Sequence, residues 1–522
     1  MVLAGAALLA GSALAGAAEA SKGGTLRIAG DQIESVDPAL GYFTDTWMLE
    51  YATCAKLFNH PDQSGAAGTR VIPEVVDRTT ISKDGRTYTF TLRRSFRFHT
   101  GARVTARSFA AAFDRNAQPR LGSPATNYMR DIVGADAVIE GRAPSISGIR
   151  VLGPYRLRIR LTKPAGDLTA RLTMPFFCPI LPGTSVDPRG IDNPPGSGPY
   201  YVAEHVANQR TLLRRNPFYR GDRPANVDQV VWTHGIGAER CRQAVEDDSI
   251  DFCGVPGAPP DAWPELTEKY GLNRPGGRVF IGPSPATWFF VFNHARPAFA
   301  GDGQIALKKA INYAIDRPEL ARSYGYLAGT RTDQLLPPAL ARGEAIYPLG
   351  GADVAAARRW YARAAYKPSK LVLYAWTIPP AVTAAQVLAY NLSQIGIDLE
   401  VRYFEPLAVL AKARTRGEPF DIVMQAWQGD YADGAGFFVP GLAEWGVNLD
   451  NPQLLRRVEA TNRLTGDARR HAWADLDVDL MRNDPPWAPF LHITTRTLVS
   501  KSLGCFYSHP LYRVDLAAVC KR

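Results

Sequence analysis

The chain has 522 residues, more than the roughly 250–300 at which one hydrophobic core stops growing, so two or three domains are expected. A hydrophobic content of 46% with 21% charged residues is that of an ordinary folded protein and excludes a disordered chain. The net charge of +10 does not favour nucleic-acid binding, because the arginines are dispersed along strand-like runs such as LRIRL.

The first twenty residues indicate the compartment. Val2 to Ala18 form an uncharged run of small and apolar residues that ends in Ala18-Glu19-Ala20. The run is too short and too weakly apolar for a membrane span, and an A-x-A pattern is typical of signal-peptide cleavage. We expect residues 1–20 to be a signal peptide and the mature protein to be exported, soluble and periplasmic. No basic residue precedes the run, so the true start of the leader can lie upstream, and no cysteine before Cys54 could carry a lipid.

Six cysteines in an exported chain favour disulfide bonds. Six cysteines allow fifteen arrangements in principle. Pairing sequence neighbours would close two short loops and leave one distant pair, namely Cys241–Cys253, Cys505–Cys520 and Cys54–Cys178. The spacings match no zinc or C-x-x-C pattern, so metal or redox chemistry is the weaker interpretation and no cofactor is expected.

Hydrophobic periodicity predicts the elements of the first part of the chain. GGTLRIAG (23–30) is predicted to be a strand. Apolar residues alternate with threonines in TYTFTL (87–92), after a turn at Lys83-Asp84-Gly85, which predicts a β-hairpin. Thr105 is a suitable N-cap for the helix that follows. A second hairpin is predicted within 144–164.

Later segments alternate between the apolar spacing of helices and that of strands. The segment GAERCRQAVEDDSIDFCGV predicts a helix and a short strand, and Ile305–Tyr324 places its apolar residues on one helical face. Helices and strands then alternate up to PFDIVMQAW (419–427). Such alternation favours an α/β lobe built on a parallel sheet.

Several of these segments resemble the family 5 solute-binding proteins of bacterial ABC importers, whose members bind peptides, nickel or glycans. The pattern "S-x-D-G-x-x-Y-x-F-x-L-R" is matched from Ser82 to Arg93, and "F-H-D-G-x-x-x-T-A" from Phe98 to Ala106, except at Thr100. Arg107 also departs from the pattern. The helix "R-x-A-I-x-x-A-I-D-R" is matched with Lys308 in the place of its first arginine.

The resemblance implies a two-lobed periplasmic binding protein of type II, an α/β protein with an extra inserted domain. Its three domains would be domain I (21–55, 180–276 and 492–522), domain II (56–179, rich in β-hairpins) and domain III (277–491). It also implies membrane partners, the permease and ATPase subunits of an importer. We expect a monomer that binds no nucleic acid.

The segment FDIVMQAWQGDYADGAGFF (420–438) carries the predicted site. An apolar strand runs into a loop of aromatic, acidic and glycine residues, and ligands of α/β sheets collect at the carboxyl ends of strands. The loop resembles the family motif "W-x-x-D-Y-x-D-P-x-x-F", with Gly434 in the place of proline. The resemblance implies that Asp430 pairs with the α-ammonium of a peptide and that the preceding strand binds its main chain. The alternative is an aspartate that caps the next turn.

The residues predicted to contact the ligand share this loop or an aromatic character; they are Asp430, Trp427, Tyr431, Gly429, Phe437, Trp445 and Tyr42. Trp47 and Trp288 are further aromatic candidates. For each aromatic residue, packing in the core is the alternative interpretation. Dipeptide binders of this family often carry an arginine where this chain has 378–382, IPPAV, so an oligopeptide is expected rather than a dipeptide.

These observations predict a binding protein and not an enzyme. The sequence has no G-x-S-x-G, H-E-x-x-H or P-loop motif in a suitable context, and its eight histidines are scattered. Binding of nickel, a metal chelate, haem, a glycan or another cationic solute is the alternative within the family. An exported hydrolase is a more remote alternative.

Overall fold

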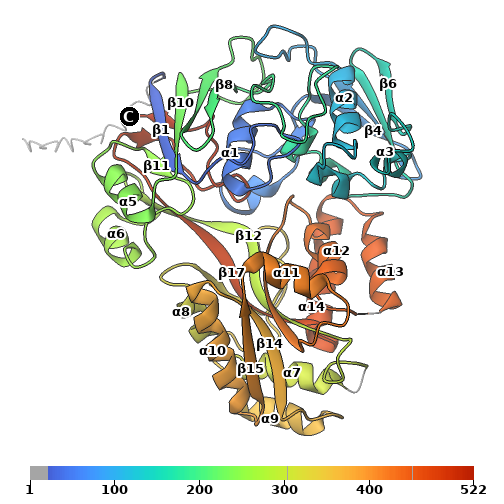
Figure 1. The fold of residues 1–522 in the computed structure, drawn as a ribbon, viewed down its shortest axis with the longest axis vertical. Helices are drawn as coiled ribbons and strands as arrows, with labels where there is room; N and C mark the ends of the chain where they lie inside the picture. Colours follow the sequence, from blue (N-terminus) through green and yellow to red (C-terminus); the bar gives the residue numbers. More distant parts are fainter. Residues whose placement is uncertain (1–21, 302–303, 450) are drawn as a thin grey trace, which may run out of the picture.

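The structure is a computed structural model that describes residues 22–301, 304–449 and 451–522. It has two lobes, joined by the long strands β12 (Val279–Phe292) and β17 (Trp487–Leu498) (Figure 1). The predicted signal peptide, residues 1–20, lies outside the described residues. Within the described ranges, no helix combines the length and the apolar character needed to cross a bilayer.

The first lobe, at the top of Figure 1, contains a five-stranded sheet of order β11-β1-β10-β9-β8. The first strand of the chain pairs in parallel with both β10 and β11, so distant segments share one sheet. The strands are β1 (Thr25–Gly30), β8 (Tyr200–Val206), β9 (Arg210–Arg215), β10 (Gln229–His234) and β11 (Phe252–Cys253). The helices beside this sheet are α1 (Thr44–Thr53), α5 (Ala238–Glu246) and α6 (Trp263–Tyr270). The short strands β18 (Leu503–Gly504) and β19 (Cys520–Lys521) pair nearby.

A four-stranded antiparallel sheet of order β4-β5-β7-β6 completes the first lobe. Its strands are β4 (Val76–Ile81), β5 (Thr87–Leu92), β6 (Ile149–Gly153) and β7 (Arg156–Arg160). The two predicted hairpins are confirmed. Gly85 has a φ of 67° in the β4–β5 turn, a conformation that glycine adopts without strain. On β5 the apolar residues are buried and the threonines are half-buried, because one face of the sheet covers the core.

Helices and short elements surround this sheet. The helix α2 (Ala106–Asn116) begins at the predicted N-cap Thr105, which forms a capping box with Ser108. The remaining elements of this part are β2 (Phe58–Asn59), β3 (Ile72–Pro73), α3 (Ala135–Ile139), α4 (Leu168–Arg171) and the 3₁₀ helices η1 (Gly65–Thr69), η2 (Pro124–Tyr128) and η3 (Pro175–Phe177).

The second lobe is built on a six-stranded sheet of order β13-β17-β12-β16-β14-β15. Its further strands are β13 (Gly329–Arg331), β14 (Lys370–Trp376), β15 (Asp398–Phe404) and β16 (Ile422–Gln428). The expected parallel arrangement holds for β14, β15 and β16. It is wrong for the other half, where β12 enters from the first lobe, β17 returns to it, and the two strands pair antiparallel.

Helices cover both faces of this sheet (Figure 1). They are α7 (Ile305–Ala314), α8 (Arg317–Ser323), α9 (Val354–Arg363), α10 (Pro379–Ser393), α11 (Pro406–Arg414), α12 (Ala435–Glu444), α13 (Pro452–Thr461) and α14 (Gly466–Asn483). The single helix expected over 305–324 is divided between α7 and α8. Asp316 accepts a hydrogen bond from the Glu319 amide at 3.0 Å and caps a new helix that has a proline in its first turn.

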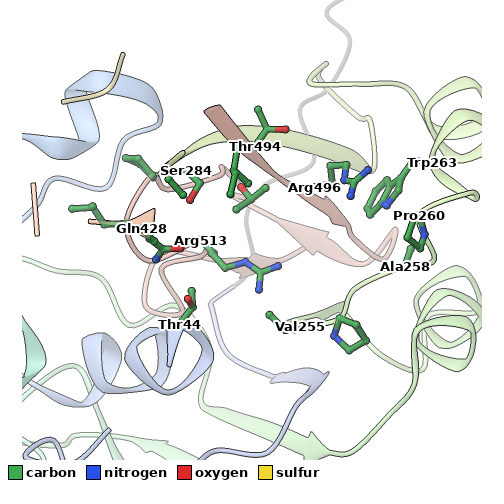
Figure 2. A pocket seen from close by; sticks show the side chains of 16 residues that line it. Thr44, Val255, Ala258, Pro260, Trp263, Ser284, Gln428, Thr494, Arg496 and Arg513 are labelled. Atoms are coloured by element: carbon green, nitrogen blue, oxygen red, sulfur yellow. The ribbon is translucent and has the colours of Figure 1, made fainter. Parts of the chain in front are cut away.

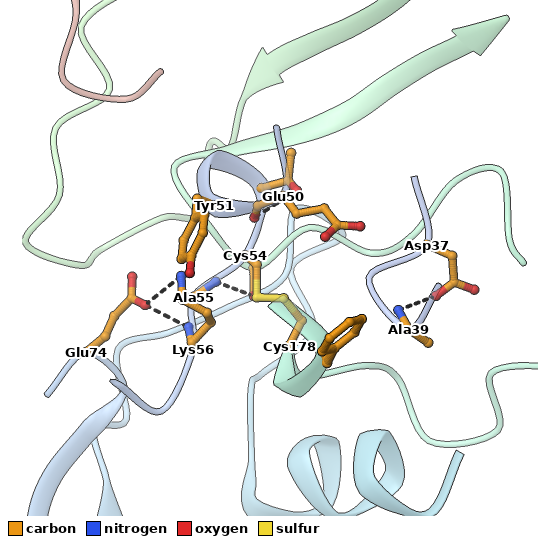
Figure 3. The surroundings of a disulfide bond; sticks show 12 residues. Asp37, Ala39, Glu50, Tyr51, Cys54, Ala55, Lys56, Glu74 and Cys178 are labelled. Atoms are coloured by element: carbon orange, nitrogen blue, oxygen red, sulfur yellow. Dashed lines mark hydrogen bonds and ion pairs between the residues drawn. A yellow bond between two sulfur atoms is a disulfide. The ribbon is translucent and has the colours of Figure 1, made fainter. Parts of the chain in front are cut away.

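All six cysteines are paired in the structure, and the pairs are Cys54–Cys178, Cys241–Cys253 and Cys505–Cys520. Cys54 follows α1 and Cys178 follows η3, so their bridge joins the two ends of a segment of the first lobe, with a sequence separation of 124 residues (Figure 3). Close to it, the buried side chain of Lys56 lies 3.9 Å from Glu74, and burial lowers the pKa of this lysine to about 7.

Candidate functional site

Asp430 lies where the two lobes meet. It follows β16, at the carboxyl end of that strand. Its carboxylate accepts a hydrogen bond of 2.9 Å from the Tyr42 hydroxyl and one of 2.7 Å from the Tyr128 hydroxyl. Both tyrosines belong to the first lobe: Tyr42 precedes α1 and Tyr128 is the last residue of η2. Three distant chain segments therefore converge on one carboxylate.

Aromatic rings hold the two tyrosines in place. The Phe176 ring stacks on Tyr42 with a centroid distance of 6.0 Å and on Tyr128 with one of 5.9 Å. Trp47 packs edge-on against Phe176 at 5.5 Å. Burial, together with the charge of Asp430, raises the pKa of Tyr128, so that its hydroxyl stays protonated and remains a donor. The result is a carboxylate held by two hydroxyls at the edge of an aromatic cluster, and such an anion can pair with a cation.

Tyr431 makes a second contact between the lobes. Its buried hydroxyl donates to Asp167 of the first lobe at 2.9 Å. Burial would raise the pKa of Asp167, but the charges of Arg171 and Arg469 hold it below its ordinary value. The Tyr431 ring packs in the core of the first lobe, edge-on to Tyr128 at 6.2 Å. Tyr431 thus lies at the lobe junction, where its side chain packs against residues of the first lobe.

The carboxylate of Asp433 is bound by side chains and backbone of its own lobe. Arg469 donates to both of its carboxylate oxygens at 2.7 and 2.9 Å, and the Trp473 indole donates at 3.0 Å. The same carboxylate accepts from the Ala435 amide at 2.9 Å at the start of α12. Burial raises the pKa of Asp433 even though Arg469 opposes the shift. These contacts fix the loop that carries Asp430.

The other predicted residues of the loop lie behind this junction. The Trp427 indole donates to the Gly436 carbonyl at 2.7 Å, and the Gly429 amide donates to the Pro285 carbonyl at 2.8 Å. A Cβ atom on Gly429 would lie 2.7 Å from the Phe437 ring, so only glycine fits. Phe437 is 0% and Trp445 is 1% exposed, and both pack in the core of the second lobe. They support the loop from behind in this structure.

The remaining aromatic candidates are also well packed. Trp47 and Trp288 are each 7% exposed, whereas Tyr42 is 37% exposed. Tyr128, which binds Asp430, and Phe176, which stacks on both tyrosines, were not singled out in the sequence. Tyr128 is 302 residues from Asp430 along the chain, and no local pattern marks it as a partner.

A cavity of about 270 Å³ lies between residues of the two lobes (Figure 2). The first lobe contributes Thr44, Val255 and Arg513 to its lining. The joining strands contribute Ser284 and Arg496, among others, and Gln428 lines it at the end of β16. Because Gln428 precedes Asp430 by two residues, the cavity and the carboxylate share the same end of the strand.

Comparisons with known proteins agree with this architecture. Residues 70–448 match the model of the bacterial extracellular solute-binding proteins, family 5, middle region. The periplasmic oligopeptide-binding protein OppA of Escherichia coli is 24% identical over 245 residues, which cover 45% of this chain and 43% of OppA. This chain thus matches less than half the length of that relative. The periplasmic murein peptide-binding protein MppA of E. coli is 24% identical over 443 residues, 80% of this chain and 79% of MppA.

Solved structures show the same fold. The clavulanic acid biosynthesis oligopeptide binding protein 2 superposes with a TM-score of 0.85 at 22% identity and covers 96% of each chain. The unliganded open form of MppA superposes with a TM-score of 0.78 at 21% identity, covering 96% of this chain and 98% of MppA. The predicted two-lobed type II binding-protein fold is therefore confirmed. With the family model matched over most of its length, the chain belongs to the family 5 bacterial extracellular solute-binding proteins.

Proposed function

We propose that this protein is the periplasmic solute-binding component of an ABC importer and that it binds peptides through their free amino terminus at Asp430. The observation that carries the proposal is the convergence of Tyr42 and Tyr128 on the Asp430 carboxylate at the lobe junction. The names of the relatives, which include oligopeptide- and murein peptide-binding proteins, support a peptide as the ligand.

The chemistry of the junction suits an ammonium group. The α-amino group of a peptide has a pKa of roughly 7.7–8.0 and is mostly a cation at neutral pH. It offers three N–H donors, which can replace the neutral hydroxyl donors of Tyr42 and Tyr128 on the carboxylate. An ammonium group also adds a direct charge–charge attraction to the carboxylate, which a neutral hydroxyl lacks. The exchange therefore favours a guest with a free amino terminus.

The end of β16 also offers a backbone edge to a peptide. β16 pairs with β12 over its whole length, up to Gln428. Its pairing with β14, in contrast, is limited to Ile422 and Val423. In the described part of the chain, residues 424–428 thus have no ladder partner on their β14 side. An extended peptide can add to such an edge through main-chain hydrogen bonds, which do not depend on its sequence.

The joining strands supply the hinge in the proposed mechanism. The β12–β17 pairing has register shifts between Pro283 and Thr287 and again after Trp288, where the strands pass from one lobe to the other. Shifting a two-state equilibrium from 1:99 to 99:1 takes roughly 5.5 kcal/mol of differential binding. A micromolar ligand supplies about 8 kcal/mol in total. Lobe movement driven by a peptide is thus energetically feasible.

The partners and the domain boundaries belong to the same proposal. We infer that the five-stranded, four-stranded and six-stranded sheets mark domains I, II and III with the boundaries given above. A monomer with a bound peptide would present both lobes to the permease, and the ATPase subunits would drive uptake.

The test is a comparison of Asp430→Asn with the wild type, using one tripeptide with a free and with an acetylated amino terminus. Removing one partner of a buried charge pair costs about 2–5 kcal/mol, so the free peptide should bind at least thirtyfold more weakly to the variant. The acetylated peptide should bind equally weakly to both proteins. Asp467→Asn, at an exposed position of α14, is the matched control.

Equal losses for both peptides would remove Asp430 from the binding role. Calorimetry with metal chelates, haem and oligosaccharides on the same protein would reveal a different ligand class. Peptide cleavage in the same samples would contradict the assignment as a binding protein.

A further inference from the structure

The four-stranded sheet of the first lobe gathers arginines on its exposed face. This sheet, of order β4-β5-β7-β6, lies at the right-hand end of the lobe in Figure 1. Its inner face carries the apolar residues of β5 and β7, which pack in the core with Phe109 of α2. We call the outer face the arginine face. Its arginines are Arg78 on β4, Arg150 on β6, and Arg156, Arg158 and Arg160 on β7, and all of them are exposed.

The register of the strands brings these side chains together. Arg150 lies directly opposite Arg158 across β6 and β7. Arg78 lies opposite Thr91, and Thr91 lies opposite Arg156 on its other side. Residues that are directly opposite share a face of the sheet, with their Cβ atoms about 5 Å apart. The arginines are dispersed in the sequence, and only the folded sheet concentrates their charge.

No carboxylate neutralises the arginine face. The only acidic residue in the four strands is Asp77, at the bulge of β4. Among the residues that the structure describes, none of the five arginines lies within ion-pair distance of an aspartate or glutamate. Asp84, in the β4–β5 turn, pairs with Arg86 instead. Because like charges on opposite strands destabilise a sheet, the face costs stability that an anionic partner would restore.

The composition of the arginine face argues against a protein partner. Protein interfaces place aromatic and apolar residues at the centre of the contact. Here threonines lie between the arginines; they are Thr80, Thr87, Thr89 and Thr91. Hydroxyl and guanidinium groups both donate hydrogen bonds, and guanidinium binds phosphate oxygens in pairs. The face therefore suits a phosphate-bearing partner.

The shape of the charged area distinguishes a surface from a chain of phosphates. Along β7 the three arginines span about 13 Å, and the two outer strands, which carry Arg78 and Arg150, lie about 14 Å apart. A linear polyanion would follow a single line of charges. The positive charge extends equally in both directions, as the phosphates of a lipid surface do.

Apolar side chains at both edges of the sheet favour a lipid surface as well. Ile81, at the end of β4, is 44% exposed, and Leu152 of β6 is 38% exposed. Apolar residues beside basic ones can enter the boundary between headgroups and acyl chains. A soluble polyanion has no apolar layer to receive them.

We infer that the arginine face docks on an anionic phospholipid surface, where its guanidinium groups bind lipid phosphates. A basic residue close to such a surface strengthens binding about fivefold, so several together give reversible attachment. The inference goes beyond the proposed function and does not depend on Asp430. For the importer component proposed above, docking would keep the binding protein beside its permease.

The test is flotation of the full chain with vesicles of phosphatidylcholine, with and without about 30% phosphatidylglycerol. The wild type should float with the anionic vesicles at about 50 mM salt and be released at about 500 mM, because salt screens exposed charges. It should not float with the neutral vesicles. Combining Arg156→Gln, Arg158→Gln and Arg160→Gln should weaken binding to the anionic vesicles by about tenfold or more.

The matched control removes the same net charge elsewhere. Arg240, Arg416 and Arg456 are exposed arginines on α5, after α11 and on α13. Replacing these three by glutamine should leave vesicle binding within about threefold of the wild type, because they lie outside the arginine face. The β7 variant should also melt at or above the wild-type temperature, since it removes repulsion between neighbouring arginines.

Three results would overturn the inference. Equal losses in the two triple variants would attribute the attraction to net charge alone. Binding to anionic vesicles that persists at high salt, or a lower melting temperature of the β7 variant, would show that the arginines have another role. A wild type that binds heparin but not anionic vesicles would identify a soluble polyanion as the partner. Calorimetry with a tripeptide on the same samples separates these outcomes from a failure of the proposed function.

Discussion

His492 provides a test of how the stability of the fold responds to pH. It lies on β17 opposite Thr287 of β12, beside the register shift that separates the lobes. Its Nδ1 lies 2.9 Å from the Thr287 hydroxyl, and that hydroxyl itself donates to the Leu335 carbonyl at 2.8 Å. The ring nitrogen must therefore be the donor. The side chain is 6% exposed, and burial lowers its pKa from 6.5 to about 3.

The sign and size of the effect follow from this pKa. Below pH 6.5 the unfolded chain binds a proton at His492 that the folded chain excludes, so acid favours unfolding. The contribution of His492 is complete above pH 6.5 and is lost as the pH falls toward 3. Each pH unit in this window is worth about 1.4 kcal/mol, which gives a loss of about 2 kcal/mol between pH 6.5 and pH 5.

The assay is urea unfolding of the wild type and of His492→Asn at pH 7 and pH 5, followed by circular dichroism. Asparagine keeps a donor for Thr287 but does not titrate. The free energy of unfolding of the wild type, relative to that of the variant, should fall by about 2 kcal/mol between the two pH values. Thr287→Val, which removes the acceptor and adds no titrating group, should lower stability by the same amount at both. Parallel curves for His492→Asn and the wild type would refute the reasoning.

Three further substitutions test the packing around the site. Asp37→Asn leaves the buried Arg115 without the carboxylate that it binds at 2.9 and 2.5 Å, and should lower the free energy of unfolding by about 3–5 kcal/mol; a urea midpoint close to that of the wild type would contradict this. Replacing Cys505 and Cys520 by serine opens a loop with a separation of 15 residues and should cost about 3 kcal/mol by the same assay; an unchanged urea midpoint would contradict this. Gly429→Ala places a Cβ atom 2.7 Å from a buried aromatic ring and should cost about 1–3 kcal/mol in thermal unfolding and weaken peptide binding; an unchanged melting temperature would show that the loop can shift.

Local signals in the sequence were sufficient for the hairpins and for α2. The β4–β5 hairpin needs only two strands and a turn that accepts a positive φ. The residues that form the turn and both strands all lie within 76–92. The same holds for Thr105, whose capping box uses the residue three positions later. Elements of this kind depend on neighbours in sequence, which is why the pattern predicts them.

Non-local pairing was harder to predict. Alternating helices and strands predict parallel neighbours, and β14, β15 and β16 satisfy this rule. The rule cannot foresee that the chain enters the second lobe along β12 and leaves it along β17, and this opposite direction of travel makes the two strands antiparallel. The break between α7 and α8 was missed for a different reason: the apolar periodicity continues across Asp316, and the cap overrides it.

For the site, the sequence located one side of the junction. The pattern of β16 and its loop places Asp430 at a carboxyl end of the sheet, where ligands collect. The residues that face it, Tyr42 and Tyr128, come from loops of the other lobe. Tyr42 entered the prediction only as one aromatic among several. Arg496 and Arg513 had no signal, since nothing in their neighbourhood shows that they line one cavity.

The junction also explains why a guest can control the lobes. Under the proposed function, the carboxylate that the peptide needs is the one that Tyr42 and Tyr128 already bind, so part of the guest's interaction energy replaces contacts between the lobes. The tyrosine bonds already end on a carboxylate and fall in the range of about 1.5–3 kcal/mol for hydrogen bonds to a charged group. The exchange is favourable because the ammonium group adds a direct charge–charge attraction to the carboxylate, which the neutral hydroxyls lack. A neutral guest gains no charge–charge attraction at Asp430. It must obtain the energy for lobe movement from its contacts with the β16 edge and the cavity.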